Sequence, residues 1–569
     1  MSKRPTNVDL LIAAVFIALI TFQPYFLHGR INLFELGIYL PGINAVLDGL
    51  VPYRDIFHLR GPLELYVPAL LMKFLGESIG VLEAYFYIGT VIALIVCVFI
   101  AKELYQTRFV LYLMVPVLAG RTFPRVVFTF WGGMRFAFGL VAVLLVIYFF
   151  KRRKIIWLFA AGLASSLAFL TSVDIGACSI LSIGATFGFA WFLKLEERGA
   201  LWKSFSVYGA GLLTILVPYG IYLYAVGALI PYIDAVYSIV VIMTKIFPDS
   251  LFENHPSSVA EAILAMGPWS PHFKHLTPAY CYLFSFFYVG LRIKKRSLSA
   301  TDLSFVCVFF YGLILYILVF RKLGSSVFEM ALQPEKIVLF FLLEAVFLTL
   351  LEKKKLFKDQ LLSKAFIEKK YLRTKIFFIN FVFCAFIGSS LGYAAQRYNN
   401  RFFFPKYMRN LLTQKKEDLK PLAGVESRLL TLDRARGMVV PVSQAEDLEQ
   451  ITEFIQKNTK PGEAVFMFPE LGSYSFVVDR PFVGRFPMVT FSWFGRGWDE
   501  ELFQDLKKTR PRFAVAQKTL PPYFEDMYFK ADSNKQKYDK VISYLEQNYG
   551  FVNSTPTLKI LRIKEEMDE

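Results

Sequence analysis

Long apolar runs recur along most of this 569-residue chain, and they constrain its fold more than any other feature. A helix that crosses the hydrocarbon core of a bilayer needs about 20 mostly apolar residues. The sequence therefore predicts an α-helical polytopic membrane protein with about 11 transmembrane helices. The predicted spans are 9–28, 79–101, 108–120, 134–150, 155–173, 175–193, 204–226, 277–293, 302–320, 336–351 and 376–394.

The charge distribution predicts the orientation of these spans. A formal net charge of +17 first suggests nucleic-acid binding. Much of the excess, however, lies in the short segments 151–154, 292–296 and 352–375. Lys and Arg in short loops mark the cytoplasmic face of a membrane protein, so topology explains the charge and we expect no nucleic-acid partner. The same rule places the N-terminus in the cytoplasm, and the first long loop and the C-terminal region outside the cytoplasmic (inner) membrane.

After residue 394 the composition becomes that of a soluble domain. The runs AVFMF, RFAVAQ and TLKILRI read as strands, and DLEQITEFIQK, WDEELFQDLKKT and KQKYDKVISYLEQNY read as helices. Such alternation predicts a small α/β domain. We therefore expect a membrane domain over 1–394, whose first outer loop is 29–78, and an extracytoplasmic α/β domain over 395–569. A cap over a membrane site and a docking module are both compatible with this domain.

The loop 29–78 concentrates charged residues beside apolar helices. Charged groups at a membrane boundary lose hydration, so a cluster of them usually serves a function. A desolvated Glu35 would be a better base, but it could equally cap a short interfacial helix. Arg54 and Asp55 follow a Gly- and Pro-containing turn, which either aims them at a site or makes them an ion pair that holds the loop. His58 is more often structural than catalytic at such a position.

Cationic residues near the predicted outer ends of spans are candidates for binding an anionic lipid headgroup. Arg54 and Arg60 lie in the first loop, while Arg121, Arg321 and Lys336 lie in or beside later outer loops. A guanidinium matches the geometry of a phosphate and can bind it through two hydrogen bonds. The alternative is that these side chains only anchor the helices at the interface.

Two further residues lie beside the same predicted face. Arg135 follows an aromatic-rich outer loop and is another candidate contact for a headgroup. Asp174 lies at an outer turn between two predicted spans, where it is either a helix N-cap or a second polar group of the site.

The sequence predicts no resident cofactor. Its five cysteines lie in or beside apolar runs and lack the paired spacing of a metal site, so we expect them to be core residues. Dependence on a divalent metal stays open.

The first loop resembles that of the GT-C fold, polyprenyl-phosphate-sugar-dependent glycosyltransferases, a group that includes protein O-mannosyltransferases and lipid A aminoarabinose transferases. Many relatives have an Asp–Glu pair after the first span, where this chain has Phe34-Glu35. Many also carry an Arg and a His in the loop before the late spans, where this chain has Arg321 and Glu329 but no His. The matching segments are Glu35-Leu36-Gly37-Ile38-Tyr39, Asp48-Gly49, Pro52-Tyr53-Arg54-Asp55-Ile56-Phe57, Gly61-Pro62 and Lys73-Phe74-Leu75-Gly76.

The resemblance implies a membrane glycosyltransferase that moves a sugar from a polyprenyl-phosphate donor to an acceptor hydroxyl with inversion. It implies Glu35 as the catalytic base, and membrane lipids and a lipid, glycan or protein acceptor as partners. Asp55, next to Arg54 in the same loop, is the second choice for the base. The predicted substrate-binding residues are Tyr39, Arg54, His58, Arg60, Arg121, Arg321 and Lys336. Two other functions remain open: a transporter or flippase of lipid-linked glycans, and a catalytically inactive scaffold.

Overall fold

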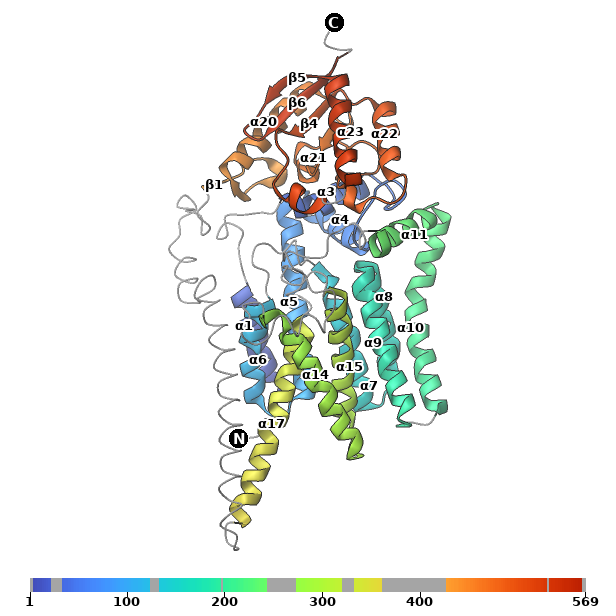
Figure 1. The fold of residues 1–569 in the computed structure, drawn as a ribbon, viewed down its shortest axis with the longest axis vertical. Helices are drawn as coiled ribbons and strands as arrows, with labels where there is room; N and C mark the ends of the chain where they lie inside the picture. Colours follow the sequence, from blue (N-terminus) through green and yellow to red (C-terminus); the bar gives the residue numbers. More distant parts are fainter. Residues whose placement is uncertain are drawn as a thin grey trace.

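The computed structural model describes residues 4–21, 33–122, 133–195, 198–242, 273–319, 332–360, 426–529 and 532–564. Its helices form an elongated bundle with an α/β region at one end (Figure 1). The predicted span 376–394 lies outside the described residues. The bundle consists of α1 (Asn7–Thr21), α5 (Ile79–Leu104), α6 (Arg108–Thr122), α7 (Ala137–Arg152), α8 (Ile156–Thr171), α9 (Val173–Phe192), α10 (Arg198–Ala225), α14 (Phe273–Lys294), α15 (Ala300–Val319) and α17 (Leu332–Gln360).

Several of these helices meet the requirements of a membrane span. Within the described residues, four are long and apolar enough to cross a bilayer, namely Ile79–Leu104, Val173–Phe192, Gly199–Ala225 and Ala300–Val319. The protein is therefore an integral membrane protein with several candidate spans. The other bundle helices coincide with predicted runs, although the total of about 11 spans is not established by this criterion.

Three short helices lie between the bundle and the α/β region: α3 (Leu33–Leu47), α4 (Leu63–Leu75) and α11 (Leu229–Tyr237). With 13 residues, α4 is too short to span a bilayer. The chain enters α4 by passing very close to the end of α8. The Gly61 N–H donates to the carbonyl oxygen of Thr171 at 3.0 Å, and a Cβ on Gly61 would lie 2.1 Å from the carbonyl oxygen of Leu170. Only glycine fits this contact, which fixes the position of the loop before α4.

The α/β region contains a four-stranded sheet with the order β3-β4-β6-β5. Strand β3 runs parallel to β4, while β4–β6 and β6–β5 are antiparallel. The three predicted strands and three predicted helices are confirmed, and β5 adds an edge strand that was not predicted. The strands are β1 (Ser427–Leu429), β2 (Val439–Pro441), β3 (Phe466–Phe468), β4 (Phe513–Gln517), β5 (Tyr549–Ser554) and β6 (Leu558–Ile563), and the helices are α20 (Val442–Asn458), α21 (Gly472–Val478), α22 (Trp498–Thr509) and α23 (Asp532–Asn548).

The first loop and the α/β region share one apolar core. The ring of Phe57 lies 4.9 Å from that of Trp498, and the Phe57 N–H donates to the carbonyl oxygen of Arg485 at 2.7 Å. Helices α3 and α21 cross so closely that a Cβ on Gly472 would lie 2.5 Å from the carbonyl oxygen of Gly37. These contacts are as tight as those within a domain, so the α/β region positions α3 rather than resting loosely on it.

A polar contact reinforces this interface. The guanidinium of Arg434 donates to the side-chain oxygen of Asn44 at 2.9 Å and pairs with Glu77 and Asp479. It also lies 4.9 Å from the ring centroid of Phe476. One arginine of the α/β region thus contacts both α3 and the segment that follows α4.

Candidate functional site

Polar side chains gather where the first loop meets the ends of α8 and α9. Arg60 lies just before α4, and its Nε donates to the hydroxyl of Tyr39 on α3 at 3.4 Å. The charge of Arg60 also interacts with Glu35, Glu64 and Asp174. Arg60 is therefore surrounded by acidic or phenolic groups that come from three different segments.

A second arginine approaches the same place from the segment before α7. Arg135 ends the short 3₁₀ turn Gly133–Arg135 and is 7% exposed. Its guanidinium donates to the Ser172 hydroxyl at 2.9 Å and to the Asp174 carboxylate at 2.9 Å. Asp174 also accepts a hydrogen bond from the Ile175 N–H. Of the two interpretations of Asp174, the structure favours a polar group paired with Arg135 over a simple N-cap, because Ser172 precedes α9 at the N-cap position.

Glu64 completes this group from the first turn of α4. It is 1% exposed, and the Tyr85 hydroxyl donates to one of its carboxylate oxygens at 3.4 Å. Burial raises the pKa of Glu64 to about 8, although Arg135 and Arg60 oppose the shift. At neutral pH this carboxyl group is therefore mostly protonated. We call Glu35, Tyr39, Arg60, Glu64, Arg135 and Asp174 the boundary cluster.

Glu35 occupies the side of the boundary cluster that faces the α/β region. It lies in the first turn of α3 and is 7% exposed. The preceding residue, Phe34, packs against Trp493 and Tyr523 of the α/β region, with ring centroids 5.9 and 6.5 Å apart. The structure thus holds Glu35 in a desolvated position between Arg60 and the α/β region.

The α/β region contributes a buried acid next to Glu35. Glu470 follows β3 and is 6% exposed. Thr490 Oγ1 donates to one carboxylate oxygen at 2.8 Å, and the Tyr523 hydroxyl donates to the other. Burial raises the pKa of Glu470 to about 7; these hydrogen bonds oppose the shift, and the nearby charge of Glu35 adds to it. Nothing in the sequence around Glu470 marked it as part of a site.

Two of the predicted site residues lie apart from the boundary cluster and pair with each other. Arg54 donates two hydrogen bonds to Asp55, each 2.7 Å long, and one to the Val226 carbonyl oxygen at 2.8 Å. The Asp55 carboxylate also accepts from the Val51 N–H at 2.8 Å. The hydrogen bond from Arg54 holds the pKa of Asp55 below its usual range, which makes this carboxylate a weaker base. This arrangement fits the interpretation in which Arg54 and Asp55 form an ion pair that holds the loop.

The remaining predicted residues occupy varied positions. His58 is buried beside Tyr39, and burial together with the charge of Arg60 lowers its pKa to about 3, so the imidazole is neutral and offers no charge to a phosphate. Lys336 is buried in α17 and pairs with Glu335. Arg121 lies in α6, but its side chain is outside the described residues, and Arg321 lies outside them entirely.

The described residues offer no preassembled metal site. In this part of the chain, no three His, Cys, Asp or Glu side chains are grouped closely enough to hold a metal ion. The four cysteines that it includes are free and buried, as expected for core residues.

Comparison with known proteins supports the fold. No protein-family model matches the chain, and no curated protein matches it by sequence. The crystal structure of ArnT from Cupriavidus metallidurans in the apo state matches over 98% of this chain and 97% of that chain, with 12% identity and a TM-score of 0.50. The structure of the same protein bound to undecaprenyl phosphate covers the same shares, with 11% identity and a TM-score of 0.49.

A third structure is the oligosaccharyltransferase from Archaeoglobus fulgidus, tethered with an acceptor peptide. It matches over 98% of this chain and 74% of that chain, with 13% identity and a TM-score of 0.46. The chain is thus structurally similar over nearly its whole length to GT-C fold glycosyltransferases, as its first loop suggested.

Proposed function

We propose that this protein is a membrane glycosyltransferase that moves a sugar from a polyprenyl-phosphate donor to an acceptor hydroxyl, with inversion and with Glu35 as the base. The observation that carries the proposal is the boundary cluster, in which a desolvated carboxylate lies beside two arginines. The GT-C fold of the chain supports the reaction class. The resemblance of the first loop supports the lipid-linked donor.

The two arginines suit the donor phosphate. Arg60 and Arg135 reach the cluster from two different segments, and a phosphate that leaves with extra negative charge is stabilised by such preorganised cations. Arg135 is bound to Asp174 in this structure, so the donor phosphate has to share it with that carboxylate. Protonated Glu64 adds a neutral hydrogen-bond donor at the same place without repelling the phosphate.

Glu35 suits the role of base better than Asp55 does. A base must approach the acceptor hydroxyl and gain from accepting its proton. Burial of Glu35 favours this, whereas the hydrogen bond from Arg54 holds the pKa of Asp55 below its usual range. We therefore assign catalysis to Glu35 and a structural role to the Arg54–Asp55 pair.

The membrane supplies the donor, so the cluster belongs at a boundary of the bilayer. We assign 1–394 to the membrane domain and 395–569 to an α/β domain on the outer side of the cytoplasmic membrane. The basic segment 352–375 then lies in the cytoplasm. A reporter fused at Glu569 should give an extracytoplasmic signal and one near Lys364 a cytoplasmic signal, and the reverse pattern would contradict the assignment.

Replacing Glu35 by glutamine tests the assignment of the base. The purified Glu35→Gln protein should lose about 10²–10⁴-fold in turnover of a polyprenyl-phosphate sugar, which is the usual contribution of general acid–base catalysis. The matched control is Asp55→Asn, which makes the same chemical change in the same loop and should keep most of its activity. Full turnover in Glu35→Gln, or equal losses in both variants, would contradict the assignment.

A further inference from the structure

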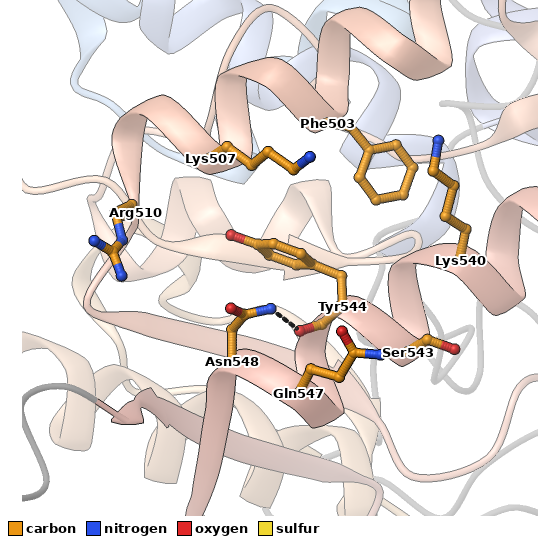
Figure 2. A pocket seen from close by; sticks show the side chains of 8 residues that line it. All are labelled: Phe503, Lys507, Arg510, Lys540, Ser543, Tyr544, Gln547 and Asn548. Carbon is orange, nitrogen blue, oxygen red and sulfur yellow. Dashed lines mark hydrogen bonds between the residues drawn. The ribbon is translucent and has the colours of Figure 1, made fainter.

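A cationic groove lies between α22 and α23 on the α/β region (Figure 2). It has a volume of about 690 Å³, which is within the usual range for a ligand site. The side chains of Lys507 and Lys540 extend toward Phe503 from the two helices, and the ring of Tyr544 lies between them and Asn548. We call this feature the α22–α23 groove; it is lined by Phe503, Lys507, Arg510, Lys540, Ser543, Tyr544, Gln547 and Asn548.

The lining of the groove combines positive charge with uncharged polar groups and aromatic rings. Three of its residues are cationic and none is acidic. Lys540 pairs with Glu500 at 2.6 Å and lies 4.3 Å from the ring centroid of Phe503. Lys507 is exposed and makes no ion pair with any described residue. A net positive charge therefore remains for a ligand.

The helix dipole explains only part of this charge. Cations near a helix C-terminus are stabilised by the dipole, and this applies to Lys507 and Arg510 at the end of α22. It does not apply to Lys540, which lies in the middle of α23. The cations reach the α22–α23 groove from two different helices, so the dipole of one helix does not explain why they lie together.

The groove lies away from the contact between α22 and the first loop. Helix α22 begins at Trp498, which packs against Phe57 of the first loop. Its 12 residues make it about 18 Å long, and the groove lies beside its second half. We therefore expect the ligand to be water-soluble, or to be a chain that extends away from the first loop, rather than a lipid headgroup.

The uncharged groups indicate the chemistry of the rest of the ligand. The half-buried Tyr544 offers a flat ring, and its contact with Phe503, 6.3 Å between centroids, holds it in place. The Asn548 amide is oriented by its hydrogen bond to the Tyr544 carbonyl oxygen, 2.8 Å long. Ser543 and Gln547 add a hydroxyl and an amide. An aromatic face with neighbouring amides and hydroxyls suits a sugar ring, and the cations suit a negative substituent on it.

From this arrangement we infer that the α22–α23 groove binds an anionic saccharide, a sugar that carries a phosphate or a carboxylate. Lys507 binds the anionic group, and Tyr544 supports the sugar ring. The inference concerns binding alone and does not depend on the transfer reaction proposed above.

Binding to the full-length protein in lipid nanodiscs tests this inference. Glucose 1-phosphate and glucuronic acid represent the two anionic classes. Glucose and inorganic phosphate are the controls, because each is one of the two parts of glucose 1-phosphate. Saturation-transfer NMR without any donor lipid should show one of the anionic sugars binding more tightly than glucose and phosphate. The charge-neutral variant Lys507→Gln should weaken that binding at least about tenfold, as expected for a lost charged hydrogen bond. Lys508→Gln, which removes the same charge outside the groove, should leave it unchanged.

Two results would overturn the inference. One is that neither anionic sugar binds at 10 mM, or binds no better than glucose or phosphate. The other is equal weakening by Lys507→Gln and Lys508→Gln, which would indicate a diffuse surface charge instead of a site. The binding assay contains neither donor nor acceptor, so a negative result in it says nothing about the Glu35→Gln turnover assay. In the same way, a result that contradicts Glu35 as the base would not change the binding measured here.

Discussion

The buried carboxyl group of Glu470 should make the stability of this protein depend on pH. Its pKa is raised from 4.5 to about 7 in the folded protein, chiefly by burial. The groups that face it are the hydroxyls of Tyr523, Tyr528 and Thr490 and the carboxylate of Glu35. A raised acid pKa means that the folded state holds a proton that the unfolded state has already lost.

The sign and size of the effect follow from this shift. Below about pH 4.5 the group is protonated in both states and costs nothing. Between about pH 4.5 and 7 the folded state must keep its proton, so the free energy of unfolding falls by about 1.4 kcal/mol per pH unit. Above about pH 7 the cost is constant. From pH 5 to pH 8 the cost of this one residue therefore grows by about 2.5 kcal/mol.

Thermal or denaturant unfolding in detergent at several pH values measures this difference. Relative to the wild type, Glu470→Gln should gain about 2–3 kcal/mol between pH 5 and pH 8, because glutamine does not ionise. Glu525→Gln removes an exposed carboxylate from a nearby segment and should follow the wild-type profile. Parallel profiles for the wild type and Glu470→Gln would refute the reasoning, since the carboxyl would then titrate alike in both states.

Two further predictions concern the contacts that hold the first loop. Gly61→Ala places a Cβ against the backbone of Leu170, so it should destabilise the protein by about 1–3 kcal/mol and reduce sugar transfer. The control Gly80→Ala meets only ordinary van der Waals contacts and should have neither effect. Arg434→Ala removes the contact with α3, so it should lower the free energy of unfolding by about 1.5–3 kcal/mol and speed proteolysis of the α/β region. The control Arg436→Ala, at an exposed position, should change the free energy of unfolding by less than about 0.5 kcal/mol. Both are checked by unfolding curves beside transfer assays.

Much of the fold was predictable because it follows from local patterns. Apolar runs of span length locate the helices of the bundle, and strand–helix alternation locates the sheet and its helices. The edge strand β5 was missed because most of its residues are partly or fully exposed, so no alternation of apolar and polar residues marked it. How the first loop would pack on the α/β region was also unpredictable, since that depends on contacts between residues about 430 positions apart, such as Gly37 and Gly472.

The site was only partly predictable for the same reason. The loop pattern indicated Glu35, Tyr39 and Arg60, and the structure places them together. The same pattern also indicated Arg54 for substrate binding and Asp55 as the second choice of base, because sequence shows which charges are near one another along the chain but not which of them pair with each other. Glu64 stood in the loop without a distinguishing signal: its position against Arg60 arises from the tight entry into α4.

The position of Glu470 gives the α/β region a physical role at the site. Its carboxyl group and that of Glu35 repel one another when both are ionised, and each lies in a poorly hydrated place. The proton on Glu470 therefore affects how readily Glu35 accepts one, although the two residues lie far apart in the sequence. The α/β region contributes Glu470, holds α3 through Arg434 and packs against Phe34. It is therefore a structural part of the site that contains the boundary cluster. Of the two interpretations of the C-terminal region, these contacts favour a cap over the membrane site.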